Sequence, residues 1–138
     1  MNEHLPIFVY GTLKRREERE KMWPHAPVDV RAATVRAALY DLGSYPAITQ
    51  GDDLVVGELW FVRDDHLAAT LDALDKIEGY NQGGEDLYVR RIVECESNES
   101  EVRAYTYFYA DETAILSARR VIPDTAGECV WKASKKDR

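Results

Sequence analysis

Residues 7–14 are IFVYGTLK, an aromatic and β-branched run that ends at a glycine. Such a run favours a buried strand, and Gly11 stops it abruptly. Gly11 can adopt a positive φ or let a ligand approach the backbone closely, and the N–H groups of Thr12 and Leu13 follow outside the strand. Two interpretations are open: a simple strand end with a glycine turn, or a loop whose N–H groups bind an anion or an oxyanion.

The length and charge of the chain restrict the class of protein. It has 138 residues, so we expect one domain with one core over residues 1–138. The formal net charge is −7 and no basic surface indicates binding to nucleic acid or to an anionic membrane. The first ten residues lack a basic segment followed by an apolar one, and no apolar run approaches the roughly 20 residues that span a bilayer. The sequence therefore predicts a cytoplasmic protein with no nucleic-acid or membrane partner.

The cysteines and histidines show no pattern of a metal site. Cys95 and Cys129 are far apart in sequence, and neither belongs to a Cys-x-x-Cys pair. This favours ordinary reduced thiols over a disulfide or a metal centre. The histidines have no ligand-like spacing. We expect no metal and no cofactor.

Four further segments have the composition of strands: residues 35–42 (VRAALYDL), 54–62 (LVVGELWFV), 87–95 (LYVRRIVEC) and 101–110 (EVRAYTYFYA). The last two flank the polar turn SNES and predict an antiparallel hairpin. Before the second segment, Asp52 and Asp53 indicate a turn. Within it, Gly57 implies a bulge or a close backbone approach, and Glu58 is a carboxylate inside an otherwise apolar run.

Tyrosines occur at several positions where a pocket could form. Tyr45 and Pro46 follow a glycine turn and either line a pocket or simply pack over the core. In the last strand, Tyr105, Tyr107 and Tyr109 alternate with apolar residues. That face is either a half-exposed sheet surface or part of a pocket, and we favour the surface.

Three other segments are predicted to lie outside the main sheet. Residues 14–21 (KRREEREK) mix basic residues with three glutamates, which indicates a solvated helix or loop rather than a nucleic-acid arm. Residues 111–120 have helical character. The tail from residue 131 is expected to fray.

A helix is predicted from residue 64, where Asp64 or Asp65 can cap its start. Leucines then recur at helical spacing, and Glu78 falls on the same stripe as Leu67, Leu71 and Leu74. Gly79 follows as a natural terminator. Glu78 thus occupies a position that faces the core.

This placement predicts an unusual acid. A partly buried carboxylate at the negative end of a helix dipole is disfavoured as an anion, so its pKa should rise toward neutrality. Such a group can take and give a proton near pH 7. The alternative is that the helix ends earlier and Glu78 turns to solvent or pairs with an arginine such as Arg90. The spacing alone leaves both open.

Together these segments resemble the γ-glutamylcyclotransferase-like (AIG2-like) family. The resemblance covers most of residues 7–109. It is carried by residues 8–13 (FVYGTL), 39–43 (LYDLG), 45–47 (YPA), 56–60 (VGELW), 71–72 (LD), 78–79 (EG), 88–90 (YVR) and 104–107 (AYTY). Each motif is weak alone, whereas their order and spacing are specific.

The resemblance implies a fold, an activity and a site. The fold is α+β, a small mixed β-barrel with flanking helices and a cavity at one end. The activity is release of 5-oxoproline from a small-molecule γ-glutamyl amino acid or γ-glutamylamine. Glu78 would be the catalytic acid/base. The residues expected to bind substrate are Tyr10, Gly11, Thr12, Leu13, Tyr45 and Tyr88. Thr12 stands where many members have serine. In this respect the chain resembles the branch that acts on γ-glutamylamines.

The chemistry needs no metal or cofactor, because the γ-glutamyl group carries its own nucleophile. Its α-amine attacks the γ-carbonyl and closes a five-membered lactam, with Glu78 moving the proton. The loop of residues 10–13 would hold either the α-carboxylate or the developing oxyanion. Two other functions are open: a protein that binds a γ-glutamyl group or another carboxylate without turnover, and a hydrolase that uses Glu58 with Glu78. The sequence predicts no oligomeric state.

Overall fold

The computed structural model describes residues 3–132, in which one sheet of seven strands curls into a closed barrel. The strands are β1 (Ile7–Val9), β2 (Asp29–Asp41), β3 (Pro46–Phe61), β4 (Tyr88–Ser97), β5 (Ser100–Tyr109), β6 (Arg119–Arg120) and β7 (Glu128–Cys129). Five of them close the barrel in the order β2-β4-β5-β1-β3, because β3 also pairs with β2. The β1–β5 and β3–β7 pairs are parallel and the others antiparallel. The predicted mixed β-barrel is confirmed.

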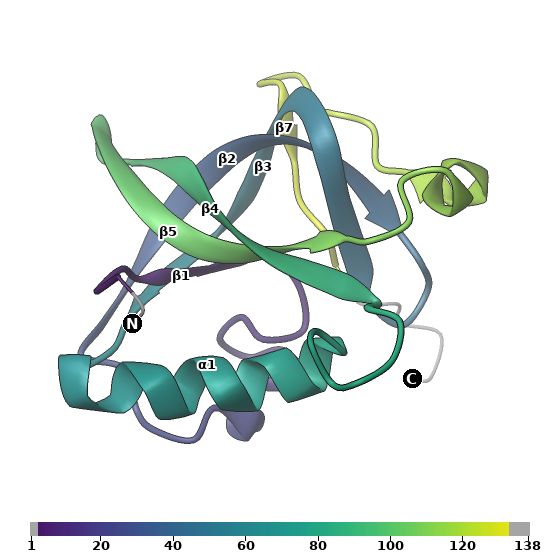
Figure 1. Cartoon of the computed structure of the whole chain (residues 1–138). Coiled ribbons are helices and arrows are strands. Elements are labelled where there is room, and N and C mark those ends of the chain that lie inside the picture. Colours follow the sequence, from purple (N-terminus) through teal and green to yellow (C-terminus); the bar gives the residue numbers. More distant parts are fainter. Residues whose placement is uncertain (1–2, 133–138) are drawn as a thin grey trace.

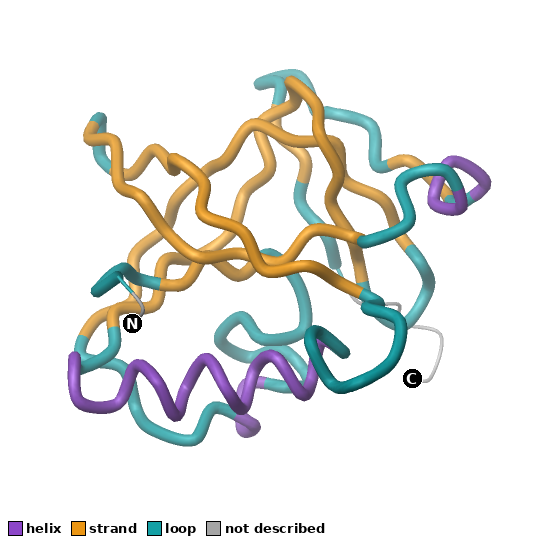
Figure 2. Tube along the Cα trace, viewed as in Figure 1, coloured by secondary structure: helices purple, strands orange, loops and turns teal. Residues whose placement is uncertain are grey.

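One α-helix, α1 (Asp64–Glu78), lies along the outside of the barrel in the described part of the chain (Figure 1). The remaining helical segments there are two short 3-10 turns, η1 (Glu20–Met22) and η2 (Ala114–Ser117). Figure 2 shows that loops make up most of the connections after β1 and after β5. Flanking helices are predicted from the sequence, and within residues 3–132 one α-helix covers the barrel. No helix within residues 3–132 has the length and apolar character to cross a membrane.

Strands β2 and β3 form one long antiparallel hairpin, which corrects the turn predicted at Asp52 and Asp53. Ala37 pairs with Asp53 and Ala38 pairs with Thr49, so residues 50–52 form a bulge inside a continuous strand. A bulge bends its strand and increases the local twist, which a long strand needs in order to curl round a barrel. The acidic pair marks this bend, and the chain reverses earlier, before Pro46.

Strands β4 and β5 form the predicted antiparallel hairpin. Its two-residue turn places Asn98 and Glu99 at φ of 51° and 64°, as a type I′ turn requires. The preference for an exposed tyrosine face was wrong for the inner part of β5, since Tyr105 and Tyr107 are 5% and 3% exposed. The face is covered because these tyrosines pack in the same cluster as the leucines of α1.

Apolar side chains pack on both faces of the sheet. One cluster joins the barrel wall to α1 and contains Ile7, Val9, Leu67, Leu71 and Leu74. The other contains Phe8, Tyr10, Leu39, Ile48 and Trp131. Alternate residues of β1 belong to different clusters, so the strand is buried on both faces. This is the physical reason why residues 7–10 are apolar or aromatic without alternation.

Other segments differ from their predictions. Residues 14–21 are mainly turns that end in η1, and residues 111–120 contain η2 and β6 rather than an α-helix. Trp131 is 2% exposed and its Nε1 donates a hydrogen bond to Asp41, so the chain is anchored at this point. Residues 133–138, the rest of the predicted frayed tail, lie outside the described residues. Cys95 and Cys129 are buried free thiols.

Candidate active site

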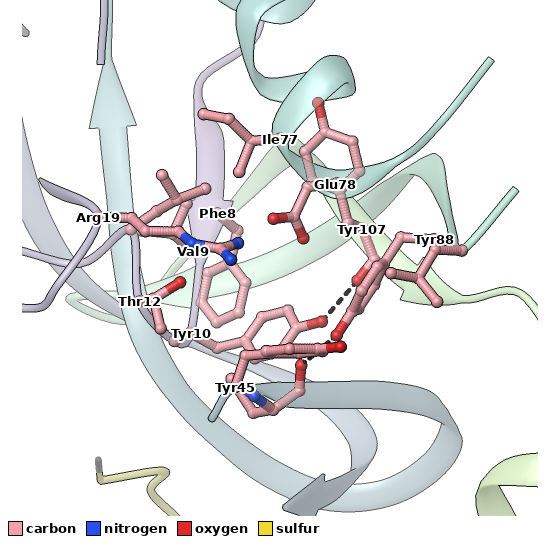
Figure 3. Close-up of a pocket in the computed structure, with 14 residues that line it drawn as sticks. Phe8, Val9, Tyr10, Thr12, Arg19, Tyr45, Ile77, Glu78, Tyr88 and Tyr107 are labelled. Atoms are coloured by element: carbon pink, nitrogen blue, oxygen red, sulfur yellow. Dashed lines mark hydrogen bonds between the residues drawn. The ribbon is translucent and has the colours of Figure 1, made fainter. Parts of the chain in front are cut away.

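A cavity of about 100 Å³ opens where the end of β1 meets the C-terminal end of α1. Its lining comes from five places: residues 8–13, Arg19, the Tyr45-Pro46 segment, the last turn of α1, and the hairpin of β4 and β5 with the preceding Leu87. Figure 3 shows these side chains converging on one space. The volume suits a small polar group, since one water molecule in the liquid occupies about 30 Å³.

All seven predicted site residues line this cavity. They are Tyr10, Gly11, Thr12, Leu13, Tyr45, Glu78 and Tyr88. These residues come from the loop after β1, the turn before β3, the end of α1 and β4. The closed barrel thus brings together residues as much as 78 positions apart (Tyr10 and Tyr88). The structure therefore brings the predicted site residues together in one cavity.

Glu78 is the last residue of α1, and Gly79 ends the helix at φ 67°. The N–H groups of Gly79 and Tyr80 donate to the carbonyls of Lys76 and Asp75, which closes the helix end in the left-handed manner that glycine favours. Figure 3 shows the Glu78 carboxylate directed into the cavity. The alternative, in which the helix ends earlier and Glu78 faces solvent, is wrong.

Burial raises the pKa of Glu78 to about 7, while the positive charge of Arg19 acts in the opposite direction. Arg90 does not pair with Glu78. It forms an ion pair of 2.9 Å with Asp75, one turn earlier in α1. Glu78 is thus a partly buried acid that can exchange a proton near neutral pH.

The loop after β1 uses its carbonyl groups locally. The carbonyls of Gly11, Thr12 and Leu13 accept hydrogen bonds from the Lys14 N–H (3.1 Å), the Arg19 N–H (2.7 Å) and the Trp23 Nε1–H (2.9 Å). Within residues 3–132, the N–H groups of residues 11–13 have no acceptor. Buried N–H groups are nearly always paired, so this loop presents donors that a ligand can use.

Gly11 is required by packing. A Cβ added there would lie 2.5 Å from Cγ of Pro46, closer than real contacts allow. The Gly11 backbone therefore packs directly against the Pro46 ring, which holds the Tyr45-Pro46 segment against the loop. Pro46 thus packs as part of the cavity lining, and it is no mere cover for the core.

Two tyrosine hydroxyls in the cavity are already engaged. Tyr10 donates to the Tyr107 carbonyl and Tyr88 donates to the Pro46 carbonyl, each at 2.7 Å (Figure 3). Burial raises the pKa of both hydroxyls, and the nearby Glu78 charge acts in the same direction. They stay neutral at physiological pH and hold the cavity in shape.

Two polar lining residues were missed as site residues by the sequence analysis. Tyr107 was placed on a sheet surface, although it belongs to one of the quoted family motifs. Arg19 was hidden in the charged run of residues 14–21, where composition gives no sign that one side chain turns inward. Its Cζ lies 5.8 Å from the centre of the Tyr45 ring.

Glu58 does not line the cavity. Its Oε1 accepts hydrogen bonds from the Arg15 N–H (2.9 Å) and from Trp60 Nε1 (3.0 Å). The structure therefore does not bring Glu58 to Glu78, and the hydrolase built on that pair is wrong. Among the described residues, no group of three or more His, Cys, Asp or Glu side chains is placed to hold a metal ion.

The sequence of residues 7–131 matches the family described as "Gamma-glutamyl cyclotransferase, AIG2-like". The chain belongs to this family. It is 33% identical over 106 residues to the γ-L-glutamyl-butirosin B γ-glutamyl cyclotransferase of Niallia circulans, covering 75% of this chain and 65% of the relative. It is 40% identical over 76 residues to a putative γ-glutamylcyclotransferase of Vibrio cholerae, covering 54% and 64%. The matches span just under two thirds of each relative.

Solved structures share this fold. A protein of Arabidopsis thaliana superimposes with a TM-score of 0.62 at 25% identity, covering 85% of this chain and 70% of that one. An AIG2-like protein of Mus musculus gives a TM-score of 0.55 at 18% identity, covering 98% and 99%. The family and both sequence relatives are named for γ-glutamyl cyclotransfer, which supports this general class of activity.

Proposed function

We propose that this member of the family releases 5-oxoproline from a γ-glutamyl amino acid or γ-glutamylamine, with Glu78 as the general acid/base. The observation that supports this most directly is the partly buried Glu78 carboxylate, with a pKa of about 7, in the same cavity as the unpaired N–H groups of residues 11–13. A proton-transfer group and a set of oxyanion donors are the two elements that this amide cleavage requires.

The reaction proceeds by intramolecular attack. The deprotonated α-amine attacks the γ-carbonyl carbon, a C–N bond forms in the five-membered ring, and the bond to the leaving nitrogen breaks. The attacking nitrogen loses one proton to Glu78, which returns it to the leaving nitrogen. No water is consumed. Holding the glutamyl chain curled supplies much of the rate, because effective molarities of oriented intramolecular reactions reach about 10⁵ to 10⁸ M.

The engaged tyrosines support the same interpretation. Because Tyr10 and Tyr88 donate to backbone carbonyls, their rings form walls against which a curled chain fits. A cavity of about 100 Å³ is small, so we expect it to hold the γ-glutamyl headgroup rather than the whole substrate. The headgroup is therefore the common element of the substrates, and the leaving group is the variable one.

The test is release of 5-oxoproline from a panel of γ-glutamyl-amino acids and γ-glutamylamines. We expect turnover by the wild type and a loss of at least about a hundredfold in Glu78→Gln, because positioned proton transfer contributes this much. The matched control is Glu58→Gln, which changes a carboxylate outside the cavity and should keep its activity.

Two outcomes would contradict the proposal. Full activity of Glu78→Gln would exclude Glu78 as the acid/base. If the protein binds γ-glutamyl compounds but releases no product from any panel member, it is a binding protein instead. Reaction in ¹⁸O-labelled water separates cyclisation from hydrolysis, since only hydrolysis places the label in the released glutamate.

A further inference from the structure

Arg19 is the cationic side chain in the lining of the cavity, and it forms no ion pair within residues 3–132. It comes from the charged loop that precedes η1, which also contains the exposed Arg15 and Arg16; the exposed Lys21 lies within η1. Its backbone N–H donates a 2.7 Å hydrogen bond to the Thr12 carbonyl, so its position is fixed relative to the loop that carries the free N–H groups. Its guanidinium is therefore available to an anionic group of a ligand in the cavity.

Figure 3 shows the Arg19 guanidinium and the Glu78 carboxylate entering the cavity toward each other. They are not bonded to each other, yet they are close enough for Arg19 to act on the charge of Glu78. The Arg19 guanidinium also lies over the Tyr45 ring. A space between a cation and an anion, bounded by aromatic rings, matches a zwitterionic ligand.

The γ-glutamyl headgroup has such a zwitterion at its α-carbon, which bears a carboxylate and an ammonium group. We infer that Arg19 binds the α-carboxylate of the γ-glutamyl headgroup, opposite Glu78, and leaves the N–H groups of residues 11–13 to the γ-carbonyl oxygen. This inference rests on the proposed function and deepens it by assigning each charged group of the substrate to one partner. The α-amine then lies beside Glu78, where its proton is removed.

Arg19 recognises a group that every γ-glutamyl compound carries, whatever amine leaves. The enzyme should therefore require a free α-carboxylate and tolerate variation in the leaving group. A compound whose α-carboxylate is replaced by a carboxamide keeps the scissile amide and the attacking amine but loses the partner of Arg19.

The first test is binding, which needs no turnover. We expect 5-oxoproline to bind the wild type about ten- to a hundredfold more tightly than its carboxamide analogue, because hydrogen bonds to charged groups contribute this range. Arg19→Gln should abolish that preference and Arg19→Lys should keep part of it, since lysine retains the charge without the planar pair of donors. Lys21→Gln, which removes an exposed charge nearby, should preserve the preference.

The inference would be overturned if the wild type bound 5-oxoproline and its carboxamide analogue equally well, or if Arg19→Gln kept the preference for 5-oxoproline. It would also be overturned if the wild type bound neither compound. A kinetic comparison identifies the competing assignment to the leaving group. If Arg19→Gln raises KM for γ-glutamyl-amino acids and leaves γ-glutamylamines unchanged, Arg19 binds the carboxylate of the leaving amino acid and the assignment is wrong. Failure of 5-oxoproline release by the wild type, with the binding preference intact, would refute the proposed reaction and not the role of Arg19.

Discussion

Tyr107 donates a hydrogen bond of 2.6 Å to Oδ1 of Asp75, which joins the barrel wall to α1 one turn before Glu78. Arg90 of β4 binds the same carboxylate through Nη1 at 2.9 and 3.1 Å. Burial raises the pKa of Asp75, whereas its bonds to Tyr107 and Arg90 oppose that rise. The cluster holds the last turn of α1 against the sheet, and so it positions Glu78 in the cavity.

Tyr107→Phe removes the hydroxyl from this cluster. We expect destabilisation of about 1 to 3 kcal/mol, because a buried carboxylate loses a donor, together with a fall in kcat. Denaturant unfolding and steady-state kinetics measure the two effects. Tyr105→Phe is the control, since its hydroxyl donates at 2.7 Å to the Glu3 carbonyl, outside the cavity. Equal effects on kcat in both variants would show that the cluster does not position Glu78.

Glu78→Gln is expected to gain stability at high pH. The folded protein favours the protonated acid, with a pKa of about 7, whereas the usual value is 4.5. The contribution of Glu78 is therefore most favourable below pH 4.5, and it is lost as pH rises toward 7. The difference corresponds to about 3 kcal/mol, so the variant should exceed the wild type by up to that amount at pH 8. Equal unfolding free energies at pH 5 and pH 8 in the wild type would contradict the raised pKa.

The activity of the wild type should rise with pH through about 7, because Glu78 must be ionised to accept a proton. The groups facing it are Arg19, Tyr10 and Tyr88, and the two tyrosines remain neutral in this range. Removal of the positive charge in Arg19→Gln raises the pKa of Glu78, so the rise in kcat/KM should move to higher pH. Lys21→Gln should leave the profile in place, and an unchanged profile in Arg19→Gln would count against this electrostatic coupling.

Gly11→Ala tests the contact between the loop and Pro46. The added Cβ would meet the Pro46 ring at 2.5 Å, and a ring fixed to the backbone cannot rotate away. We expect loss of activity and destabilisation of about 1 to 3 kcal/mol, the usual cost of overpacking. Gly84→Ala is the matched control, since nothing lies within 4 Å of its added Cβ. Thermal unfolding and 5-oxoproline release distinguish the two variants, and a fully active Gly11→Ala would show that the loop tolerates displacement.

The elements that could be predicted from sequence depend on local patterns. The apolar run of β1, the turn at Asn98 and Glu99, and the leucine stripe of α1 each reflect the conformational preference of a few neighbouring residues. Glu78 was found for the same reason, because its spacing from Leu71 and Leu74 places it on the buried face of the helix. Gly79 then marked the helix end.

The errors depend on contacts between distant segments. The acidic pair at Asp52 and Asp53 lies in a bulge of β3 that is defined only by its pairing with β2. Trp131 is anchored by Asp41, 90 positions earlier in the chain. Tyr107 has the alternation of a surface strand until α1 covers it. No pattern within any one of these segments contains that information.

The sequence by itself determined the strand that ends at Gly11, the hairpin, the helix with Glu78 at its end, and the family that these motifs specify. Their preferences are set by side chains within a few residues of one another. Only the tertiary structure decided that Glu78 shares a cavity with residues 11–13, that Glu58 is excluded from it, and that Arg19 turns inward while its neighbours remain in solvent. These facts require closure of the barrel, because burial and electrostatic interaction depend on which distant residues come together in space.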